Sequence, residues 1–524
     1  MWEGIWPVPQ PILTGPVLKN ISSNWALNVL QILIFMILAR FTLNVLGQET
    51  FGIWEAVIAA AGPLQLMILG VPVATVRAIS RAIGCDDERG AKEALGQSLT
   101  LTLILAGAAL TAGGFMWWGF EDRLLESERW SLDGAAILDT RTALAIVLIN
   151  LAAGFCLRLP YAVFEAFHDF VPRNLIMGAG MLLRLGLTIA ALTWDTSLRT
   201  LALVQVAVAV FEFTAALMVS RKRHKGIHFR PSALSIDKAR KLLSFGIFAF
   251  LLNMGALLAF KVDALVVAAH MLPKDVAVYG MANKVFDPLI NLLLAIGMVV
   301  MPAAAAMRAR NEESELRDLL FKWSKVAVFI VLTLGSYLLV FGPEFLDWWL
   351  GDEYDPAAGP LLQVLMASFL LFLPVRGVAL PILLGAGNPR GPALGLLAMG
   401  IGNLALSLIL VRTHGVWGVA LGTAIPNVIF SLFFIAGAGR TLQVQPMEWT
   451  AYSLGRVGPG LLPGLGLLLL IKLGPGASGF WPLFTVGLAF VAAQTLAALF
   501  FVWRGDPHVD PLQILRDRRR KDGT

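Results

Sequence analysis

The sequence predicts an all-α polytopic membrane protein with about 14 transmembrane helices, in two like-oriented lobes of six helices and a C-terminal pair. Composition indicates the class, the hydrophobic runs indicate the helices, and the positions of Lys and Arg indicate the orientation. Of the 524 residues, 57% are hydrophobic and only 15% are charged, and the mean hydropathy is +0.74. Soluble domains carry roughly 25% charged residues. An apolar surface of this size is stable only if the surrounding solvent is largely lipid.

Hydrophobic runs of membrane-spanning length, about 20 residues, recur along the whole chain. In the first half they occupy residues 18–44, 53–76, 95–118, 142–164, 173–193 and 199–219. In the second half they occupy residues 242–268, 277–306, 325–346, 359–384, 391–411 and 417–438, followed by 457–473 and 480–503. These runs divide the chain into an N-terminal lobe (1–219), a basic connector (220–241), a C-terminal lobe (242–438), a helix pair (439–503) and a basic tail (504–524).

Lysine and arginine residues gather on one side of the predicted helices. If the N-terminus is placed in the cytoplasm, the inside segments hold 28 of the 41 Lys and Arg residues and the outside segments hold 7. This asymmetry predicts that both termini are cytoplasmic, because basic residues accumulate in cytoplasmic loops. The connector at 220–241 holds eight of the inside charges. We expect it to contact acidic lipid headgroups and not nucleic acid, and its Gly226 and Pro231 are typical of a tether.

An internal repeat relates the two lobes. Segments 46–52 and 272–280 both lie at predicted outside turns, and each contains an acid, then an aromatic residue, then glycine. Pro72 follows Gly52 by 20 residues, and Pro302 follows Gly280 by 22. Both lobes therefore run in the same sense and should be related by an axis along the membrane normal. Many transporters are built in this way, with the substrate site at the interface between the repeats.

The run 39–72, ARFTLNVLGQETFGIWEAVIAAAGPLQLMILGVP, resembles the start of bacterial oligosaccharide-lipid flippases, the Wzx-like polysaccharide exporters of the MOP (multidrug/oligosaccharidyl-lipid/polysaccharide) superfamily. The second half is similar to the same family in short pieces at 278–280, 300–302, 341–345, 349–354, 384–390 and 418–423. The resemblance covers most of the first twelve predicted helices. It implies a two-lobed MOP/MATE-like bundle in the bacterial inner membrane. It also implies transport of undecaprenyl-pyrophosphate-linked oligosaccharide from the inner to the outer leaflet.

A pyrophosphate headgroup needs a polar, preferably cationic, path across about 30 Å of hydrocarbon. Basic residues inside the predicted spans and away from their first and last residues are Arg40, Arg158, Arg184, Lys261, Lys284 and Arg376. Each would cost about 2.5–3.5 kcal/mol if it faced lipid at mid-depth. We therefore expect most of them to face a cavity, to pair with acids or, as for Arg40 near a helix end, to reach the interface.

Three arginines are the first candidates for binding the pyrophosphate. Arg184 lies near the middle of its helix without an acid close in sequence. Arg376 follows Pro374, where a broken helix would open its backbone to a cavity, and Arg158 precedes Pro160. Guanidinium groups suit bidentate contacts with phosphate oxygens better than ammonium groups do.

Two lysines leave more than one interpretation open. Lys284 and Asp287 are three residues apart and face the same way on a helix, so they form either an ion pair or part of the cavity wall. Lys261 is followed two residues later by Asp263, which does not share its face. Both lysines remain candidates for substrate binding, and both aspartates are candidates for ion coupling.

Uncharged and acidic polar residues complete the candidate site. Two stripes at helical spacing are formed by Asn24, Asn28 and Gln31 and by Asn283, Asp287 and Asn291. They either bind sugar hydroxyls and cavity water or form hydrogen bonds between helices. Glu212 and Glu55 are isolated acids in the spans, and each is either an ion-coupling group or a paired, interfacial one.

The expected function is alternating-access flipping of the lipid-linked oligosaccharide for surface polysaccharide such as O-antigen or exopolysaccharide. The expected partners are membrane lipids and polysaccharide assembly proteins such as a polymerase. No Gly-rich phosphate loop with Lys-Ser or Lys-Thr occurs, and the six histidines form no ligand cluster, so we expect no cofactor, no metal and no catalysis. The alternatives are a lipid II flippase, a drug/cation antiporter and, from another class, a membrane glycan polymerase or ligase.

Overall fold

The computed structural model describes residues 15–68, 70–120, 125, 129–224, 229–234, 247–455, 457–504 and 506. Within these ranges the chain is helical, with short connecting turns and no strand. The side chains of residues 15–22, 24 and 25 are not described, so the candidate Asn24 lies outside the described residues. The predicted all-α class is confirmed.

The described residues contain 12 helices that are long and apolar enough to cross a membrane, or 13 if the bent pair α9 (Ile247–Phe260) and α10 (Asp263–His270) is one span. One of the 12, Ala26–Gly84, is 59 residues long. A continuous helix of that length would extend about 90 Å, three times the hydrocarbon thickness. It is broken at Gly47, whose φ of 73° is one that glycine adopts without strain. If it is counted as two spans, and the bent pair α9 and α10 is counted as one, the total equals the number of spans predicted from the sequence.

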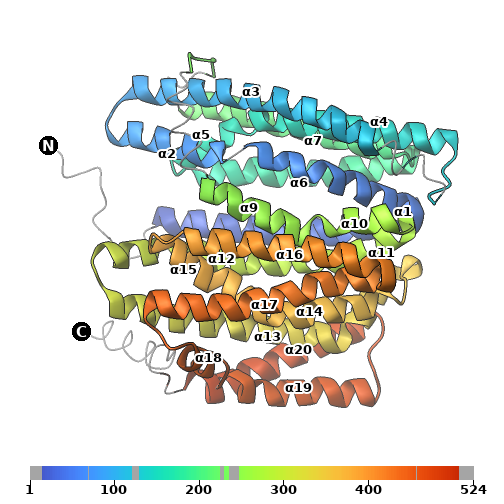
Figure 1. Ribbon diagram of the computed structural model, residues 1–524, viewed down its shortest axis with the longest axis vertical. Helices are drawn as coiled ribbons and strands as arrows, with labels where there is room; N and C mark the ends of the chain where they lie inside the picture. Colours follow the sequence, from blue (N-terminus) through green and yellow to red (C-terminus); the bar gives the residue numbers. More distant parts are fainter. Residues whose placement is uncertain are drawn as a thin grey trace. The chain divides into compact units, whose positions relative to one another are not determined.

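The chain divides into two compact units, Met1–Phe250 (unit 1) and Leu251–Thr524 (unit 2). The helices of unit 1 are α1 (Gly15–Ala61), η1 (Gly62–Ile68), α2 (Val71–Gly84), α3 (Glu88–Phe120), α4 (Gly134–Leu157), α5 (Leu159–Ala166), α6 (Phe170–Trp194) and α7 (Leu198–Arg223), followed by the start of α9 (Figure 1).

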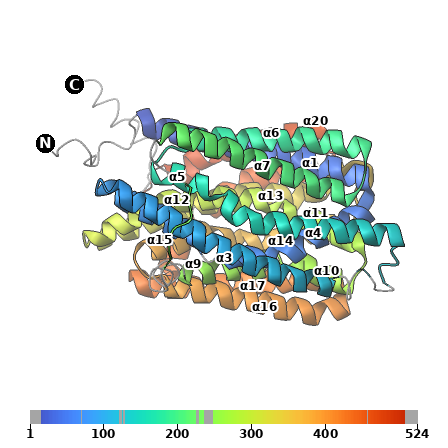
Figure 2. The same cartoon turned by 90° about the horizontal axis from the view of Figure 1, so that it is seen from above.

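In unit 1, α6 packs against α1 and α7, and Figure 2 shows α6 and α7 side by side. Gly178 of α6 faces α1 there, and a Cβ added to it would make an ordinary van der Waals contact with Leu30, at 3.5 Å. Asp139 of α4 accepts hydrogen bonds from the backbone N–H groups of Leu198 (2.7 Å) and Arg199 (3.1 Å). It thereby caps the first turn of α7, where N–H groups lack partners within the helix. These contacts fix α6 and α7, which carry Arg184 and Glu212.

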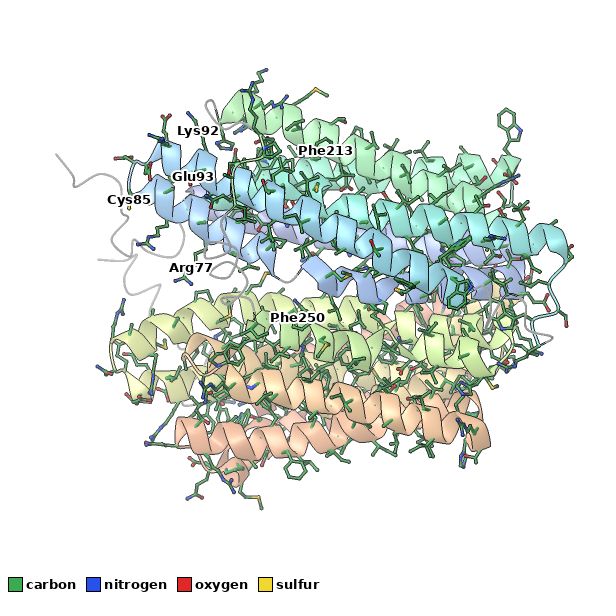
Figure 3. The ribbon with its side chains drawn as sticks, turned by 45° about the horizontal axis from the view of Figure 1, so that its top comes forward. Arg77, Cys85, Lys92, Glu93, Phe213 and Phe250 are labelled. Atoms are coloured by element: carbon green, nitrogen blue, oxygen red, sulfur yellow. The ribbon has the colours of Figure 1, made fainter. Side chains whose placement is uncertain are left out.

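Part of the predicted tether is bound to unit 1. The backbone N–H of Ser232 donates to the carbonyl oxygen of Gly96 on α3 (3.3 Å), and Thr100 Oγ1 donates to the carbonyl oxygen of Ser232 (2.8 Å). Ser232 Oγ also donates to the carbonyl oxygen of Glu93 (3.3 Å), a residue labelled near the start of α3 in Figure 3. Phe229 packs on a buried cluster formed by α2, α3 and α5. Segment 229–234, the docked strap, is therefore a fixed part of unit 1, whereas Gly226 lies outside the described residues.

The residue that ends α7 is also anchored. The His224 ring stacks on Phe167 with ring centroids 4.1 Å apart, and its Nε2 lies 3.5 Å from a carboxylate oxygen of Asp169. Burial lowers the pKa of His224 below its usual range, although Asp169 opposes this shift. At neutral pH the imidazole is therefore uncharged, and it serves mainly as an apolar ring in this contact.

We predict that Gly96→Val releases the docked strap. A Cβ at this position would lie 2.7 Å from the carbonyl oxygen of Arg230 and 2.8 Å from Ser232 Oγ, so the strap has to move. In a chain lacking Cys85 and Cys156, a cysteine at position 232 should react with a maleimide several times faster when Gly96→Val is present. Gly107→Val on the same helix is the matched control, because a Cβ there has nothing within 4 Å. Equal labelling rates in both variants would contradict the docked position.

Unit 2 begins within α9 and contains α10, α11 (Pro273–Lys284), α12 (Phe286–Ala309), α13 (Glu313–Leu350), η3 (Gly351–Glu353), α14 (Ala358–Pro374), η4 (Val375–Ala379), α15 (Leu380–Gly385), α16 (Arg390–His414), α17 (Val416–Leu442), α18 (Pro446–Gly455), α19 (Val457–Leu473), α20 (Phe480–Ala497) and η5 (Ala498–Trp503). Helix α13 packs against α14 on one side and against α18, α19 and α20 on another. The C-terminal helices therefore belong to the packed core of unit 2.

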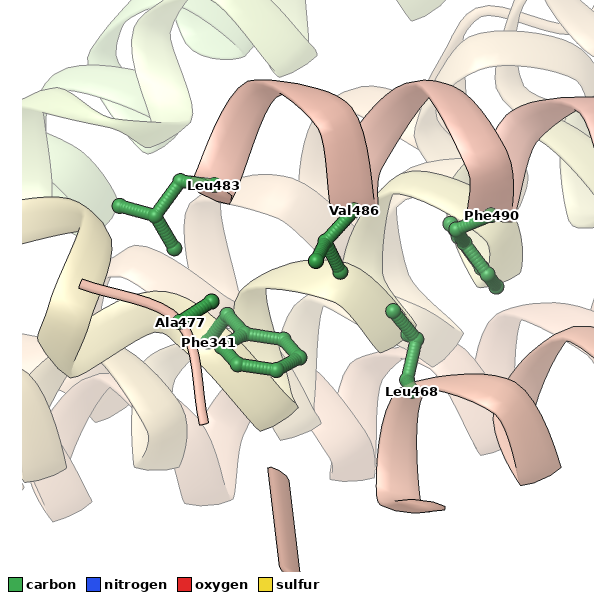
Figure 4. Packing of buried hydrophobic residues seen from close by; sticks show 6 residues of the cluster. All are labelled: Phe341, Leu468, Ala477, Leu483, Val486 and Phe490. Carbon is green, nitrogen blue, oxygen red and sulfur yellow. The ribbon is translucent and has the colours of Figure 1, made fainter. Parts of the chain in front are cut away.

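Two kinds of contact hold α19 and α20 to α13. Near one end of α13, Phe341 lies in a buried cluster with Leu468 of α19 and Leu483, Val486 and Phe490 of α20 (Figure 4). Lys472 of α19 forms an ion pair with Glu344 of α13 beside this cluster.

The second contact is a buried ion pair. Lys325 of α13 is fully buried, donates to the carbonyl oxygen of Val502 (2.8 Å) and pairs with the buried carboxylate of Asp506. Its ammonium group also lies 5.0 Å from the centroid of the Tyr452 ring and 5.3 Å from that of Trp503. An ammonium in this environment is stable only because a carboxylate, a carbonyl and two aromatic faces surround it.

Candidate substrate-binding and ion-coupling residues

A cluster of charged side chains occupies the middle of unit 1. Arg158 ends α4 and begins α5, at a break where Pro160 stands in the first turn of the new helix. Proline is tolerated there because the N–H it lacks has no partner in a first turn. One turn of chain therefore places Arg158 beside Tyr161 of α5. Helices α6 and α7 bring Arg184 and Glu212 to the same group.

Glu212 is the acid of this cluster. Its Oε2 accepts a hydrogen bond from the Tyr161 hydroxyl (3.2 Å). The side chain lies directly over Gly180 of α6, where an added Cβ would be 2.8 Å from Glu212 Cγ. Gly180 is four residues before Arg184 and therefore on the same helix face, one turn away. Glu212 interacts electrostatically with both Arg184 and Arg158.

Arg184 lies on the inward side of its helix. Leu175, Leu182 and Ile189 recur every seven residues on one apolar, exposed side of α6, where their exposed fractions are 69%, 54% and 36%. Each residue advances about 100° around a helix, so Arg184 stands about 200° from Leu182, on the opposite side. It is nevertheless exposed. Among the described residues it has no hydrogen bond or ion pair, so its guanidinium N–H groups are available to a ligand.

Arg376 is the arginine of unit 2 that the sequence named as a candidate. It lies on the π-helical turn η4, directly after Pro374 at the end of α14, and it is half-buried. This turn fits closely against α12, because a Cβ on Gly377 would lie 2.9 Å from the carbonyl oxygen of Leu293. Within the described part of the chain, Arg376 forms neither a hydrogen bond nor an ion pair. A π-turn interrupts the regular backbone and occurs often at functional sites.

Two further breaks in unit 2 are joined by an ion pair. Lys261 Nζ lies 3.1 Å from Oδ1 and 3.2 Å from Oδ2 of Asp287. Lys261 follows α9, where the chain bends by 41° into α10, and Asp287 lies in the first turn of α12, just after the break between α11 and α12. Both side chains are exposed by about half, so the pair contributes little to stability. The sequence left Lys284 open as a partner of Asp287, and the structure shows that Lys261 also reaches this carboxylate.

Asp263 belongs to a different, buried network. It is 1% exposed, and its Oδ2 accepts hydrogen bonds from the hydroxyls of Tyr279 (2.6 Å) and Thr423 (2.6 Å). Asn403 donates to Thr423 Oγ1 (3.0 Å), and Ser407 donates to Asn403 Oδ1 (3.5 Å). Asp263 Oδ1 is buried without a hydrogen-bond partner among the described residues. A buried carboxylate with a free oxygen is the kind of group that takes up a proton or a cation.

The remaining candidates are dispersed. Asn283 donates to the carbonyl oxygen of Phe260 at the end of α9 (3.5 Å), so it joins two helices, one of the two roles left open by the sequence. Gln31 and Asn291 are exposed, and Asn28 is half-buried.

The last two candidates, Glu55 and Lys284, are both half-buried, and each takes part in a further interaction.

Sequence reasoning missed several partners of these acids. Tyr161, Tyr279 and Thr423 bind the carboxylates of Glu212 and Asp263, but none of them is charged and none forms a stripe with the acid it binds. A weak signal was present in α16, where Asn403 and Ser407 are four residues apart in an otherwise apolar run. Polar pairs at that spacing share a helix face and favour contact with another helix.

Comparisons with known proteins agree with this architecture. Residues 139–359, somewhat less than half of the chain, match the family model described as "Polysaccharide biosynthesis protein". The solved structure of the lipid II flippase MurJ in an inward closed conformation has a TM-score of 0.67 and 13% identity, and covers 92% of this chain and 98% of its own. An inward-facing MATE multidrug resistance transporter of the MOP superfamily has a TM-score of 0.63 and 15% identity, and covers 79% of this chain and 98% of its own.

A third similar structure is a MOP superfamily transporter from Pyrococcus furiosus described as having a binding pocket of reverse polarity. Its TM-score is 0.52, its identity is 17%, and it covers 82% of this chain and 94% of its own. No curated protein sequence matches the chain. The fold expected from the resemblance is therefore confirmed: the chain shares its fold with these solved structures, and its residues 139–359 match the model of the polysaccharide biosynthesis family.

Proposed function

We propose that the protein is a flippase that moves undecaprenyl-pyrophosphate-linked oligosaccharide from the inner to the outer leaflet of the bacterial cytoplasmic membrane, for surface polysaccharide. The main support is a pair of arginines within the spans, Arg184 and Arg376, that form no hydrogen bond or ion pair with a described residue. Such cations are costly at membrane depth and mark substrate pathways. The family match and the fold shared with MurJ agree with this class of substrate.

The chemistry follows from what each group can bind. Arg158 and Arg184 of unit 1 and Arg376 of unit 2 can each bind pyrophosphate oxygens through the paired N–H donors of a guanidinium group. Asn24, Asn28, Gln31 and Asn291 hydrogen-bond to sugar hydroxyls, and Lys284 adds positive charge. The polyprenyl tail stays in the bilayer, while the two lobes open alternately to each side, with both termini in the cytoplasm. A polymerase or another polysaccharide assembly protein then uses the flipped substrate.

Ion coupling has its best candidate in Asp263, whose buried Oδ1 has no partner among the described residues. We predict that Asp263→Asn abolishes the dependence of transport on a proton or cation gradient and slows gradient-driven transport at least about tenfold, because the charge that takes up the ion is lost. The amide keeps the acceptor for Tyr279, so the thermal stability should fall little. Asp352→Asn, at an exposed acid of η3, is the control. Unchanged gradient dependence in Asp263→Asn would exclude this residue.

The function is tested in vesicles that contain the purified protein and a fluorescent polyprenyl-pyrophosphate-linked oligosaccharide. We expect the labelled headgroup to become accessible on the opposite side of the vesicle, and empty vesicles to give the background rate. Movement of lipid II but not of the oligosaccharide lipid would favour a lipid II flippase. Joining of the labelled repeat units would favour a glycan polymerase or ligase.

A drug/cation antiporter is the second candidate, because MATE transporters share the fold. The basic residues in the spans oppose it, since a cationic drug would be repelled by Arg184, Arg158 and Arg376. Efflux of a cationic dye in the same vesicles, without movement of the oligosaccharide lipid, would favour the antiporter.

A further inference from the structure

Glu212 is placed to act on the arginines that the proposed function assigns to the pyrophosphate. The charged groups that act on it from the elements packed against α7 are Arg184 of α6 and Arg158 at the junction of α4 and α5. Tyr161 of α5 is the titratable group in direct contact with it. Arg173 of α6 also acts on Tyr161 and is paired with Glu165 (3.2 Å). One carboxylate therefore faces two guanidinium groups.

Glu212 is close enough to Arg184 and Arg158 to attract both electrostatically, but it does not occupy their N–H donors. Glu212 attracts Arg184 and Arg158, yet its described hydrogen bond comes from Tyr161, and neither arginine forms an ion pair with it. The N–H groups of Arg184 can therefore contact a second anion. That anion is repelled by the charge on Glu212 as strongly as it would be attracted by a cation at the same distance.

We propose that Glu212 is an internal counter-anion, which competes with the diphosphate of the substrate for Arg184 and Arg158 and neutralises them after the substrate has left. This inference rests on the proposed function, because it needs these arginines to bind the headgroup. Without the substrate, two unneutralised cations at membrane depth would raise the free energy of the empty protein. With Glu212 nearby, the empty cluster carries one net positive charge instead of two, which favours its return to the starting conformation.

The counter-anion should weaken binding and speed turnover. Removing its charge keeps the substrate bound for longer and leaves the empty carrier with both cations unneutralised. Protonation of Glu212 has the same effect on binding as removing the charge, so the wild-type protein should bind anions more tightly at low pH. By thermodynamic linkage, a bound anion also favours the protonated carboxyl group.

The test uses the purified full-length protein in detergent, with inorganic pyrophosphate as the probe and calorimetry as the measurement. We expect Glu212→Gln to bind pyrophosphate about tenfold more tightly than wild type at pH 8. In the vesicle assay, the same variant should show a lower KM and a lower maximal rate. Glu448→Gln, at an exposed acid of α18, is the matched control and should leave both parameters unchanged.

The pH dependence separates this role from a structural one. Because pyrophosphate itself titrates, the quantity to compare is the ratio of the wild-type Kd to the Glu212→Gln Kd at each pH, and this ratio should fall toward one in acid. Tyr161→Phe removes the hydroxyl that stabilises the charged carboxylate, so the midpoint of this fall should move to higher pH. A ratio that stays constant with pH, or a midpoint unmoved by Tyr161→Phe, would overturn the inference.

The variant Arg184→Gln distinguishes failure of the proposed function from failure of the counter-anion role of Glu212. If this variant binds pyrophosphate as tightly as wild type, the assignment of the arginine to the headgroup is wrong, and the role of Glu212 falls with it. If Arg184→Gln binds more weakly but Glu212→Gln binds no more tightly, only the counter-anion role is excluded.

Discussion

Replacing Arg184 and Arg376 together by glutamine should reduce transport of the lipid-linked oligosaccharide to the background rate. A hydrogen bond to a charged group contributes about 1.5–3 kcal/mol, so the loss of two such contacts corresponds to about a hundredfold or greater loss in binding. Both arginines lack a hydrogen bond and an ion pair among the described residues, so their charges are not used to hold the fold. The measurement is the rate of headgroup exposure in vesicles, with protein amounts matched.

Stability provides the discriminating control for this prediction. Removing an unpaired cation from a span should leave the apparent melting temperature unchanged or raise it, since such a charge costs about 2.5–3.5 kcal/mol at the helix centre. Arg412→Gln replaces an exposed arginine in the last turn of α16 and should affect neither transport nor stability. Normal transport in the folded double variant would exclude these arginines from the substrate path. A large loss of stability would show that they have partners in the fold.

Lys325→Met should destabilise unit 2 more than any other single substitution considered above. The substitution leaves the carboxylate of Asp506 buried and without its cation, and breaking a buried pair in this way costs about 3–5 kcal/mol. For a unit of this size, each kcal/mol corresponds to about 2–4 °C, so the apparent melting temperature should fall by on the order of 10 °C. The measurement is thermal unfolding in detergent at a fixed scan rate, because unfolding of large membrane proteins is often irreversible.

The double variant Lys325→Met, Asp506→Leu tests the physical reason. It removes both charges, and replacing a whole buried ion pair by apolar groups is often neutral or stabilising. We therefore expect it to recover most of the loss. Lys274→Met, at an exposed lysine of α11, is the control and should change the melting temperature little. A double variant as unstable as Lys325→Met alone would show that lost packing against Tyr452 and Trp503, and not an unpaired charge, is responsible.

The fold class and the number of spans could be predicted because the lipid bilayer acts as the solvent of the protein. A lipid bilayer requires runs of about 20 apolar residues and complete internal backbone hydrogen bonding, and both requirements can be read along the chain. The breaks at Gly47 and after Pro374 were also visible, because glycine and proline act through their own backbone geometry. These features depend on neighbouring residues alone, so the sequence determined them.

The partners of the buried polar groups were decided by tertiary structure. Helical periodicity predicts that Lys284 and Asp287 lie on the same face of a helix. It cannot show that Lys261 reaches Asp287 across two helix breaks. Lys325 and Asp506 are 181 residues apart, and Asp263 meets Thr423 across 160. The sequence of segment 220–241 likewise predicts a free tether, whereas in the structure the carbonyl oxygen of Gly96 accepts a hydrogen bond from the backbone N–H of Ser232.

The physical reason is the same in each case. A buried charge is stable only beside a group of complementary polarity, and which group that is depends on how the helices pack. The sequence alone therefore placed the protein in a membrane and named the charged residues that need an explanation. The packing of the helices decided which of those charges are paired within the fold and which, like Arg184 and Arg376, form no hydrogen bond or ion pair with a described residue.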